Sequence, residues 1–181
     1  MKNLFILISI LFLINLSTVH GELRAGAAKV DVTPTLLPVI RNGGFLEATD
    51  NKVNDSLHAR CLVLDDRQTR LAIVVVDSCM LPIDLCDEAK RLASEKTGIP
   101  LNCILISATH SHSAPSVMNY CLGTRADPRY RNFLPRKIAD SIISANTRLQ
   151  PAKAAWGRVD AGEFTACRRW SFIRGKELTD P

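Results

Sequence analysis

Runs of apolar residues between polar clusters divide the chain into an ordered series of strands and helices. Short runs rich in β-branched residues predict strands at 25–33, 57–64, 71–77 and 101–107, with a last strand at 152–159. Helical spacing predicts a helix over 83–97, ended by Gly98 and Pro100, and a second helix that begins at Asp127-Pro128 and restarts at Pro135. No period is found after Gly162.

The order of these elements indicates an α/β fold. The polar stretch DDRQT joins the strands at 57–64 and 71–77 and predicts a hairpin. The run AIVVV is apolar at consecutive positions, which is typical of a central strand buried on both faces. The helix at 83–97 connects two strands in a β-α-β unit and implies parallel pairing. We therefore expect a mixed β-sheet with flanking helices.

Residues 1–21 have the features of a cleaved signal peptide. Lys2 precedes an apolar run from Leu4 to Leu16, and Val19 and Gly21 are placed for cleavage. The run is about 13 residues long, whereas a membrane-spanning helix needs about 20, so a permanent anchor is the less favoured alternative. The prediction is a secreted or periplasmic protein whose domain is 22–181.

Charge and cysteine spacing exclude two further classes. The net charge of +5 is scattered without a Lys/Arg block, so a nucleic-acid partner is not expected. The six cysteines all follow residue 21, where oxidising conditions would permit disulfides, but their spacing implies no particular pairing. No pair of cysteine clips is present, so a structural cysteine-zinc site is not expected.

His110 and His112 are the candidate metal-site residues. They lie just past the carboxyl end of the predicted strand 101–107, where α/β sheets bind ligands. Alternate side chains of an extended segment point to the same side, so both imidazoles can face one pocket. Imidazole is a common zinc ligand. The spacing alone favours ordinary polar loop histidines over a metal site, and the position at the strand end favours the metal site.

The segment from Ile106 to Pro115, ISATHSHSAP, resembles the SGTHTHSGPGG motif of the neutral, non-lysosomal ceramidase family. AGAAKVDVTP, NGGF, LHARCLVLDD and RLAIVVVDSCM resemble other family segments in the same order, over roughly residues 24–160. The family consists of secreted or membrane-associated zinc amidases that cleave N-acylsphingosine with an α/β catalytic domain. The resemblance implies the same fold, Zn2+ as cofactor and an N-acyl lipid substrate.

The resemblance also implies roles for individual residues. His110 would be the zinc ligand, and His112 would be a catalytic residue beside the reacting groups. Asp77, at the end of the strand 71–77, could orient a zinc-binding histidine, and a loop cap is an equally good interpretation. Ala114 and Ser116 stand where the family has glycine, so the substrate preference is open.

The remaining zinc ligands of the family are a histidine, a glutamate and a tyrosine from far downstream. No histidine follows His112, and the earlier His58 is more typical of an ordinary strand residue. We therefore expect the N-terminal portion of a ceramidase-like catalytic domain, incomplete and weak in zinc binding. The alternative is a truncated, catalytically inactive secreted α/β module.

Arg168, Arg169 and Trp170 leave two interpretations open. They could contact a lipid head group, giving peripheral contact with a membrane surface, but a solvated basic turn is favoured. The sequence pattern does not indicate an oligomeric state.

Overall fold

The computed structural model describes residues 22–120, 124–166, 169–171 and 177–179, and its centre is a five-stranded sheet in the order β6-β5-β4-β1-β7. The strands are β1 (Arg24–Asp31), β4 (His58–Asp65), β5 (Arg70–Val76), β6 (Ile104–Ala108) and β7 (Gln150–Pro151). β5 and β6 pair in parallel, and the other neighbours pair antiparallel. The predicted mixed α/β sheet is confirmed.

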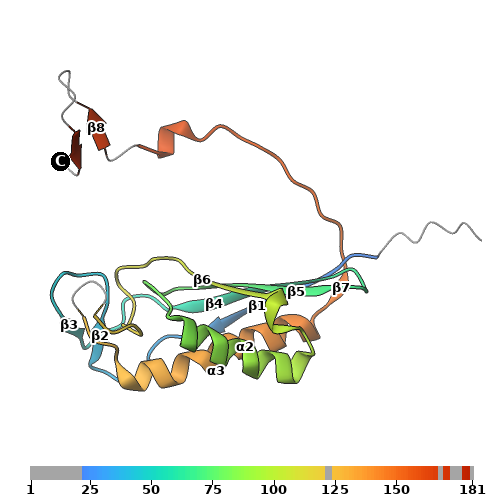
Figure 1. Ribbon diagram of the computed structural model, residues 1–181, viewed down its shortest axis with the longest axis horizontal. Helices are drawn as coiled ribbons and strands as arrows, with labels where there is room; N and C mark the ends of the chain where they lie inside the picture. Colours follow the sequence, from blue (N-terminus) through green and yellow to red (C-terminus); the bar gives the residue numbers. More distant parts are fainter. Residues whose placement is uncertain (1–21, 121–123, 167–168, 172–176, 180–181) are drawn as a thin grey trace, which may run out of the picture.

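Two helices, α2 (Ile83–Thr97) and α3 (Pro128–Thr147), cover one face of this sheet (Figure 1). α2 has the predicted bounds, because Gly98 adopts the left-handed conformation, φ 72°, that ends helices. α3 begins at Asp127, whose carboxylate accepts hydrogen bonds from the backbone N–H groups of Arg129 and Tyr130, both 3.1 Å long.

The predicted restart of the second helix at Pro135 is wrong, because α3 continues through that residue. Proline removes one helical hydrogen bond, and this cost can be offset where the helix packs tightly on both sides of it. Leu134 and Ile138 flank the proline and are fully buried against the sheet and α2. Continuous packing therefore outweighs the local break.

The core lies between the helices and the near face of the sheet. Alternate residues of β4 and β5 point into it, and Val63, Val74 and Val76 are fully buried there. At β1 the backbone comes so close to α3 that a side chain on Gly26 would lie 2.1 Å from the carbonyl oxygen of Ala145. The described core is thus one layer of helix on one face of a sheet.

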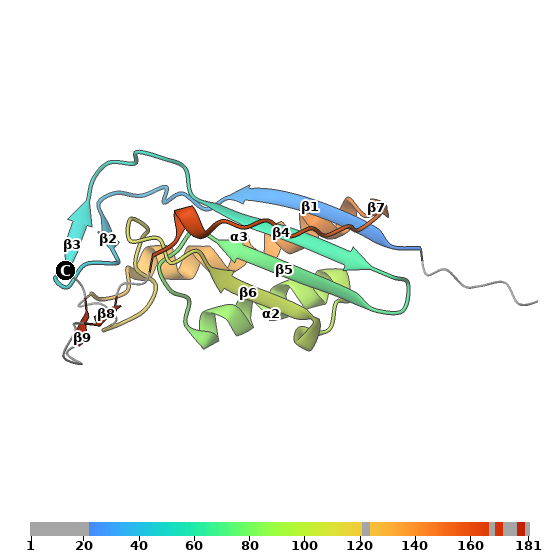
Figure 2. The ribbon, with the colours of Figure 1, turned by 90° about the horizontal axis from the view of Figure 1, so that it is seen from above.

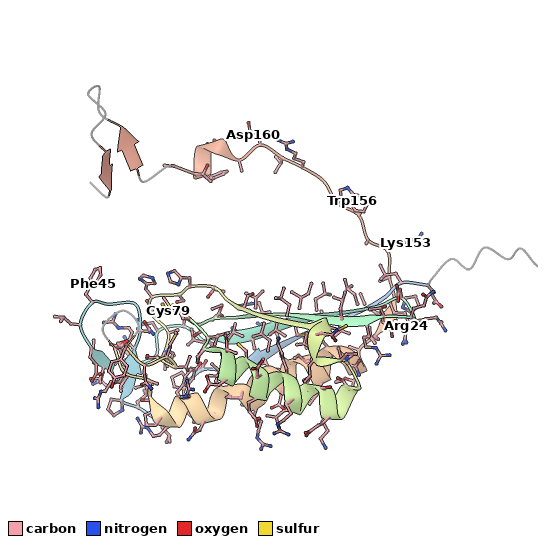
Figure 3. All side chains as sticks on the ribbon, viewed as in Figure 1. Arg24, Phe45, Cys79, Lys153, Trp156 and Asp160 are labelled. Carbon is pink, nitrogen blue, oxygen red and sulfur yellow. The ribbon has the colours of Figure 1, made fainter. Side chains whose placement is uncertain are left out.

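The opposite face of the sheet has no covering element among the described residues, so we call it the open face. Ile73 and Val75 of β5 lie on it and are each 36% exposed. The prediction that this apolar run is buried on both faces is therefore wrong for the described structure. In Figure 3 the side chains of this face stand clear of the ribbon on the side away from the helices.

The predicted strand at 152–159 is also wrong. Pairing in the five-stranded sheet ends with β7, and residues 152–161 have no regular structure. This segment stands away from the sheet in Figure 1, although it crosses over β1 and β4 in the view of Figure 2. Trp156 and Asp160 are carried on it (Figure 3). Without a neighbouring strand among the described residues, an apolar segment gains no ladder of hydrogen bonds.

The remaining elements are short. β2 (Val39–Arg41) and β3 (Ala48–Asp50) form an antiparallel ribbon beside the sheet, and β8 (Arg169–Ser171) pairs with β9 (Glu177–Thr179). Two 3-10 turns, η1 (Leu101–Cys103) and η2 (Gly162–Phe164), complete the described chain. η1 replaces the start of the predicted strand 101–107.

Some predictions fall on residues of which the structure gives no description. The signal peptide, residues 1–21, and Arg168 lie outside the described residues, and so do the side chains of Arg169 and Trp170. Among the described helices, none has the length and apolar character needed to cross a membrane.

Candidate metal centre

The candidate site lies where the parallel strands β5 and β6 end at the same edge of the sheet. The strands pair up to Val76 and Ala108. Backbone bonds continue this pairing into the loops, because Thr109 N–H donates to the Val76 carbonyl at 3.0 Å and Ser111 N–H donates to the Ser78 carbonyl at 3.1 Å. The loop that carries His110 and His112, residues 109–115, is called the histidine loop. It is therefore fixed against the loop that follows β5.

The structure brings His110 and His112 together at this edge. Their Nε2 atoms are 3.2 Å apart, and their rings meet edge-on with centroids 4.8 Å apart and planes at 78°. Both side chains are exposed. The two imidazoles therefore present adjacent nitrogens at the surface of the molecule. They do so from a turn and not from the extended segment expected from the sequence, because His110 has a left-handed φ of 61°.

A backbone carbonyl determines which nitrogen of His110 faces outward. Nδ1 of His110 lies 2.9 Å from the carbonyl oxygen of Cys79, so a proton on Nδ1 is donated there and Nε2 keeps its lone pair. Zinc-binding histidines are held by the same kind of second hydrogen bond. His110 also adopts a left-handed backbone, φ 61°, which a non-glycine residue adopts at some cost. The loop therefore holds this ring with Nε2 facing outward, where it can bind a metal ion.

Cys79 is the residue of this site that sequence reasoning missed. Its side chain is 2% exposed, and its Sγ lies 3.9 Å from Nδ1 of His110. One donor atom each from Cys79, His110 and His112 can be chosen so that all three lie within 4.8 Å of one another. The order of the strands could have identified Cys79. It follows β5 as His110 follows β6, and the carboxyl ends of neighbouring parallel strands lie at the same edge of a sheet.

Gly43 leaves room for His112. A Cβ atom on Gly43 would lie 2.4 Å from Cβ and 2.5 Å from Cα of His112, and the glycine has φ +100°. Backbone at this distance cannot yield without moving the loop, and a side chain disfavours that φ value. The glycine turn singled out in the sequence thus allows the close approach of two loops at the site.

Ala114 and Ser116, which differ from the family motif, face inward. They are 1% and 0% exposed, and the loop is bound to β2 and its end through Asn42 N–H to the Ala114 carbonyl at 3.0 Å and Ser116 N–H to the Ile40 carbonyl at 2.8 Å. Ser116 Oγ also accepts a hydrogen bond from Asn42 Nδ2 at 3.3 Å. These two side chains therefore support the histidine loop from beneath.

Asp77 takes part in a different set of contacts. Its carboxylate accepts hydrogen bonds from the His58 backbone N–H at 2.9 Å and from an Arg60 guanidinium nitrogen at 2.8 Å. Partial burial opposes ionisation, but the hydrogen bonds from Arg60 and His58 outweigh it and lower the pKa of Asp77. The described contacts of Asp77 thus join β5 to β4, and its orientation of a zinc-binding histidine stays a prediction.

His58 lies at the start of β4 with its ring against Asp77. Its Nδ1 is buried and lies 3.9 Å from an Asp77 carboxylate oxygen, beyond hydrogen-bond distance. It is not part of the group formed by Cys79 and the two loop histidines.

A cleft of about 560 Å³ lies beside the histidine loop. It is bounded by the β2–β3 ribbon and by Ser111, Ser113 and Pro115. An ion pair between Arg41 and Asp50, 2.8 Å long, contributes to its polar wall. The loop therefore lines a cleft large enough for part of a small molecule, and neither His110 nor His112 is among the residues that line it.

The donor set fits zinc. Tetrahedral zinc with Zn–N bonds of about 2.0–2.1 Å places two imidazole nitrogens about 3.3 Å apart. The observed separation of the Nε2 atoms is 3.2 Å. Imidazole and thiolate are both ligands that zinc accepts, so the residues present suit this ion.

The chain is similar in structure to known ceramidases. The crystal structure of neutral ceramidase from Pseudomonas aeruginosa matches with a TM-score of 0.63 and 25% identity, covering 72% of this chain and 22% of that chain. A ceramidase complexed with C2 matches with a TM-score of 0.61 and 25% identity, with the same shares of 72% and 22%. No protein-family model matches the chain, and no curated protein matches it significantly.

These matches agree with the motif resemblance, and they restrict it to one part of the ceramidase chain. The chain spans only 22% of the length of the ceramidases that it matches. Within that portion the order of strands, the two helices and the histidine loop belong to one α/β arrangement. The described chain therefore has the fold of a part of neutral ceramidase.

Proposed function

We propose that this chain forms the zinc-binding edge of a hydrolase that cleaves amide bonds in N-acylsphingosine or a related N-acyl lipid. The observation that carries the proposal is the pair of Nε2 atoms, 3.2 Å apart, in a chain that matches neutral ceramidase. The activity and the substrate class come from that resemblance, because one metal edge is compatible with many hydrolytic reactions.

His110 is the proposed ligand. Its Nδ1 is engaged with the Cys79 carbonyl, which leaves Nε2 to bind the ion. A zinc ion bound there would act as a Lewis acid toward an amide carbonyl and would make a water more acidic.

His112 is the proposed catalytic partner. Its exposed ring places Nε2 next to the ligand nitrogen, where it can hold a proton and pass it to the leaving amine. Gly43 keeps this ring in place by leaving space for the backbone of the loop. Asp77 is proposed as a supporting carboxylate, which acts on the site through the strand end that it ties to β4.

The proposed setting is outside the cell membrane or in the periplasm, in line with the predicted signal peptide. A lipid substrate also requires access to a membrane or micelle surface, and the basic residues near the end of the chain are candidates for that contact. Both statements stay proposals that rest on the sequence.

The test is hydrolysis of N-acylsphingosine in detergent micelles by the purified chain, with and without added zinc. We expect zinc-dependent release of fatty acid. His112→Gln should lower turnover by about 10²–10⁴-fold with zinc content unchanged, because it removes proton transfer and leaves His110 intact.

His110→Ala should abolish turnover together with zinc binding. His58→Gln is the matched control, since His58 lies outside the group of metal donors and should leave both unchanged. Turnover that survives His110→Ala, or the absence of zinc-dependent hydrolysis in the unmodified chain, would contradict the proposal.

A further inference from the structure

We infer that the thiolate of Cys79 is a second protein ligand of the metal that His110 binds, with His112 beside them as the proton-transferring residue. The inference rests on the proposed function only in using the same metal. It departs from the ligand set that the ceramidase resemblance implies, in which the other ligands come from a distant part of the chain.

Three side chains that can bind a metal ion meet at one edge of the sheet. Cys79 and the two histidines form the one group of metal donors found among the described residues, with their donor atoms within 4.8 Å. The Cys79 side chain is 2% exposed, and Figure 3 shows it at the loop end of the sheet. A buried thiol and two exposed imidazoles therefore meet at this edge.

Hydrogen bonds hold the loop of Cys79 against the loop of His110. Cys79 and His110 are 31 residues apart, yet the carbonyl of Cys79 holds the ring of His110 at 2.9 Å. The bond from Ser111 N–H to the Ser78 carbonyl fixes the two loops next to these residues. The thiol therefore has a defined position relative to both imidazoles, set by adjacent parallel strands.

Thiolate and imidazole suit the same metal ion. Catalytic zinc sites have three protein ligands and an open fourth position, and thiolate and imidazole are both common among them. Cys79 and His110 would supply two of these ligands. In such a site Sγ would be about 3.6 Å from a ligand nitrogen, so the thiol must shift by a distance on the order of 1 Å. It releases its proton to solvent as the metal binds.

A thiolate ligand changes the properties expected of the chain. With His110 as the single ligand, the 181 residues should bind zinc weakly. With Cys79 the site gains a second, anionic ligand and binds ions that accept thiolate, such as Zn2+ and Co2+, more tightly. We expect binding of one metal ion per chain.

The experiment is titration of the reduced, oxygen-free chain with Co2+, followed by absorption spectroscopy. A thiolate ligand produces an intense near-ultraviolet charge-transfer band that nitrogen and oxygen ligands do not produce. The band should appear in the unmodified chain and disappear in Cys79→Ser, which should also bind zinc at least about tenfold more weakly in competition with a chelator. Cys103→Ser is the matched control, because Cys103 lies at the opposite end of β6, and it should keep the band.

A second measurement needs no variant, in case Cys79→Ser fails to fold. Zinc X-ray absorption of the unmodified chain should show one sulfur neighbour together with nitrogen neighbours. A band that persists in Cys79→Ser, cobalt bound without a charge-transfer band, absence of cobalt binding, or zinc without a sulfur neighbour would each overturn the inference.

The same samples separate this inference from the proposed function. A sulfur-ligated metal in a chain that hydrolyses no N-acyl lipid would support the Cys79 ligand and contradict the proposed activity. Zinc-dependent hydrolysis that is unchanged in Cys79→Ser, with no sulfur neighbour, would do the reverse.

Discussion

The two faces of the five-stranded sheet differ in what covers them, although both are apolar in the middle. Along β5, Val74 points toward the helices and is fully buried, while Val75 points to the open face and is 36% exposed. The open face continues across the sheet through the cross-strand neighbours Leu62, Ile73 and Leu105. One strand therefore presents similar side chains to two very different environments.

This difference shows where stability and chemistry are located. Burial against α2 and α3 supplies the apolar contacts of the described fold. The metal donors lie at the end of β5 and β6, in loops held by backbone hydrogen bonds. Substitutions in the covered face should therefore act on folding, whereas substitutions in the loops at the sheet edge should act on metal binding.

The largest contrast is expected from truncation of one aliphatic side chain on each side of the sheet. Ile138→Ala on α3 should lower the free energy of unfolding by about 2–5 kcal/mol, because the side chain is fully buried and leaves a cavity. Leu105→Ala on the open face should cost less than about 1 kcal/mol, since Leu105 is 59% exposed. Urea unfolding measures both. Equal losses would show that the open face is covered in solution.

The next contrast uses a nearly isosteric pair on one strand. Val74→Thr buries a hydroxyl in the core and should lower the free energy of unfolding by about 1–3 kcal/mol. Val75→Thr places the same hydroxyl at the open face, where water can reach it, and should change that energy by no more than about 0.5 kcal/mol. Thermal unfolding followed by circular dichroism compares the two. A larger loss from Val75→Thr would reverse the assignment of the faces.

Gly43→Ala should distinguish effects on the metal site at the sheet edge from effects on the core. The added Cβ would meet the backbone of His112, and the left-handed φ disfavours alanine, so we expect a loss of about 1–2 kcal/mol in stability. Metal affinity should fall along with it, because the loop that carries both His112 and the ligand His110 is displaced. Gly98→Ala is the control: it also has positive φ, but its Cβ would meet nothing within 4 Å. Equal metal affinity in the two variants would contradict the positioning role of Gly43.

Much of this fold follows from local sequence signals. The bounds of α2 are set by an apolar stripe and by Gly98, and the DDRQT turn fixes the hairpin of β4 and β5. The choice of His110 and His112 as candidates follows from their spacing just past a strand end, although the left-handed turn at His110 could not be predicted from it. Each of these signals acts within a few residues, so it can be read from the sequence.

The rest depends on contacts between distant residues. The nearness of Cys79 to His110 requires the register between β5 and β6, and the continuity of α3 through Pro135 requires its packing against the sheet. An apolar run such as that of β5 does not reveal which of its faces has a partner. For the same reason, the sequence of residues 152–159 does not reveal whether a partner strand lies beside them.

The smallest contrast concerns two carboxylates on opposite faces, Asp65 and Asp77. The pKa of Asp65 is lowered chiefly by the backbone N–H of Arg67, and also by Arg70, which together outweigh burial; the pKa of Asp77 is lowered as described above. A lowered folded-state pKa means that each carboxylate stabilises the fold above its unfolded-state pKa. That contribution is lost as the pH falls through the lower, folded-state value.

Asp65→Asn and Asp77→Asn should therefore each reduce the loss of stability that occurs between about pH 7 and about pH 3. We expect the larger effect from Asp65, whose side chain is 6% exposed compared with 17% for Asp77. The pair formed by Asp77 and Arg60 should also weaken more in high salt, since the side chain of Arg60 is 49% exposed and its charge is screened by ions. Urea unfolding of both variants at the two pH values and at low and high salt measures this. A greater pH effect from Asp77→Asn would show that its carboxylate is held more strongly than its contacts with β4 explain, as expected if it also supports the histidine loop.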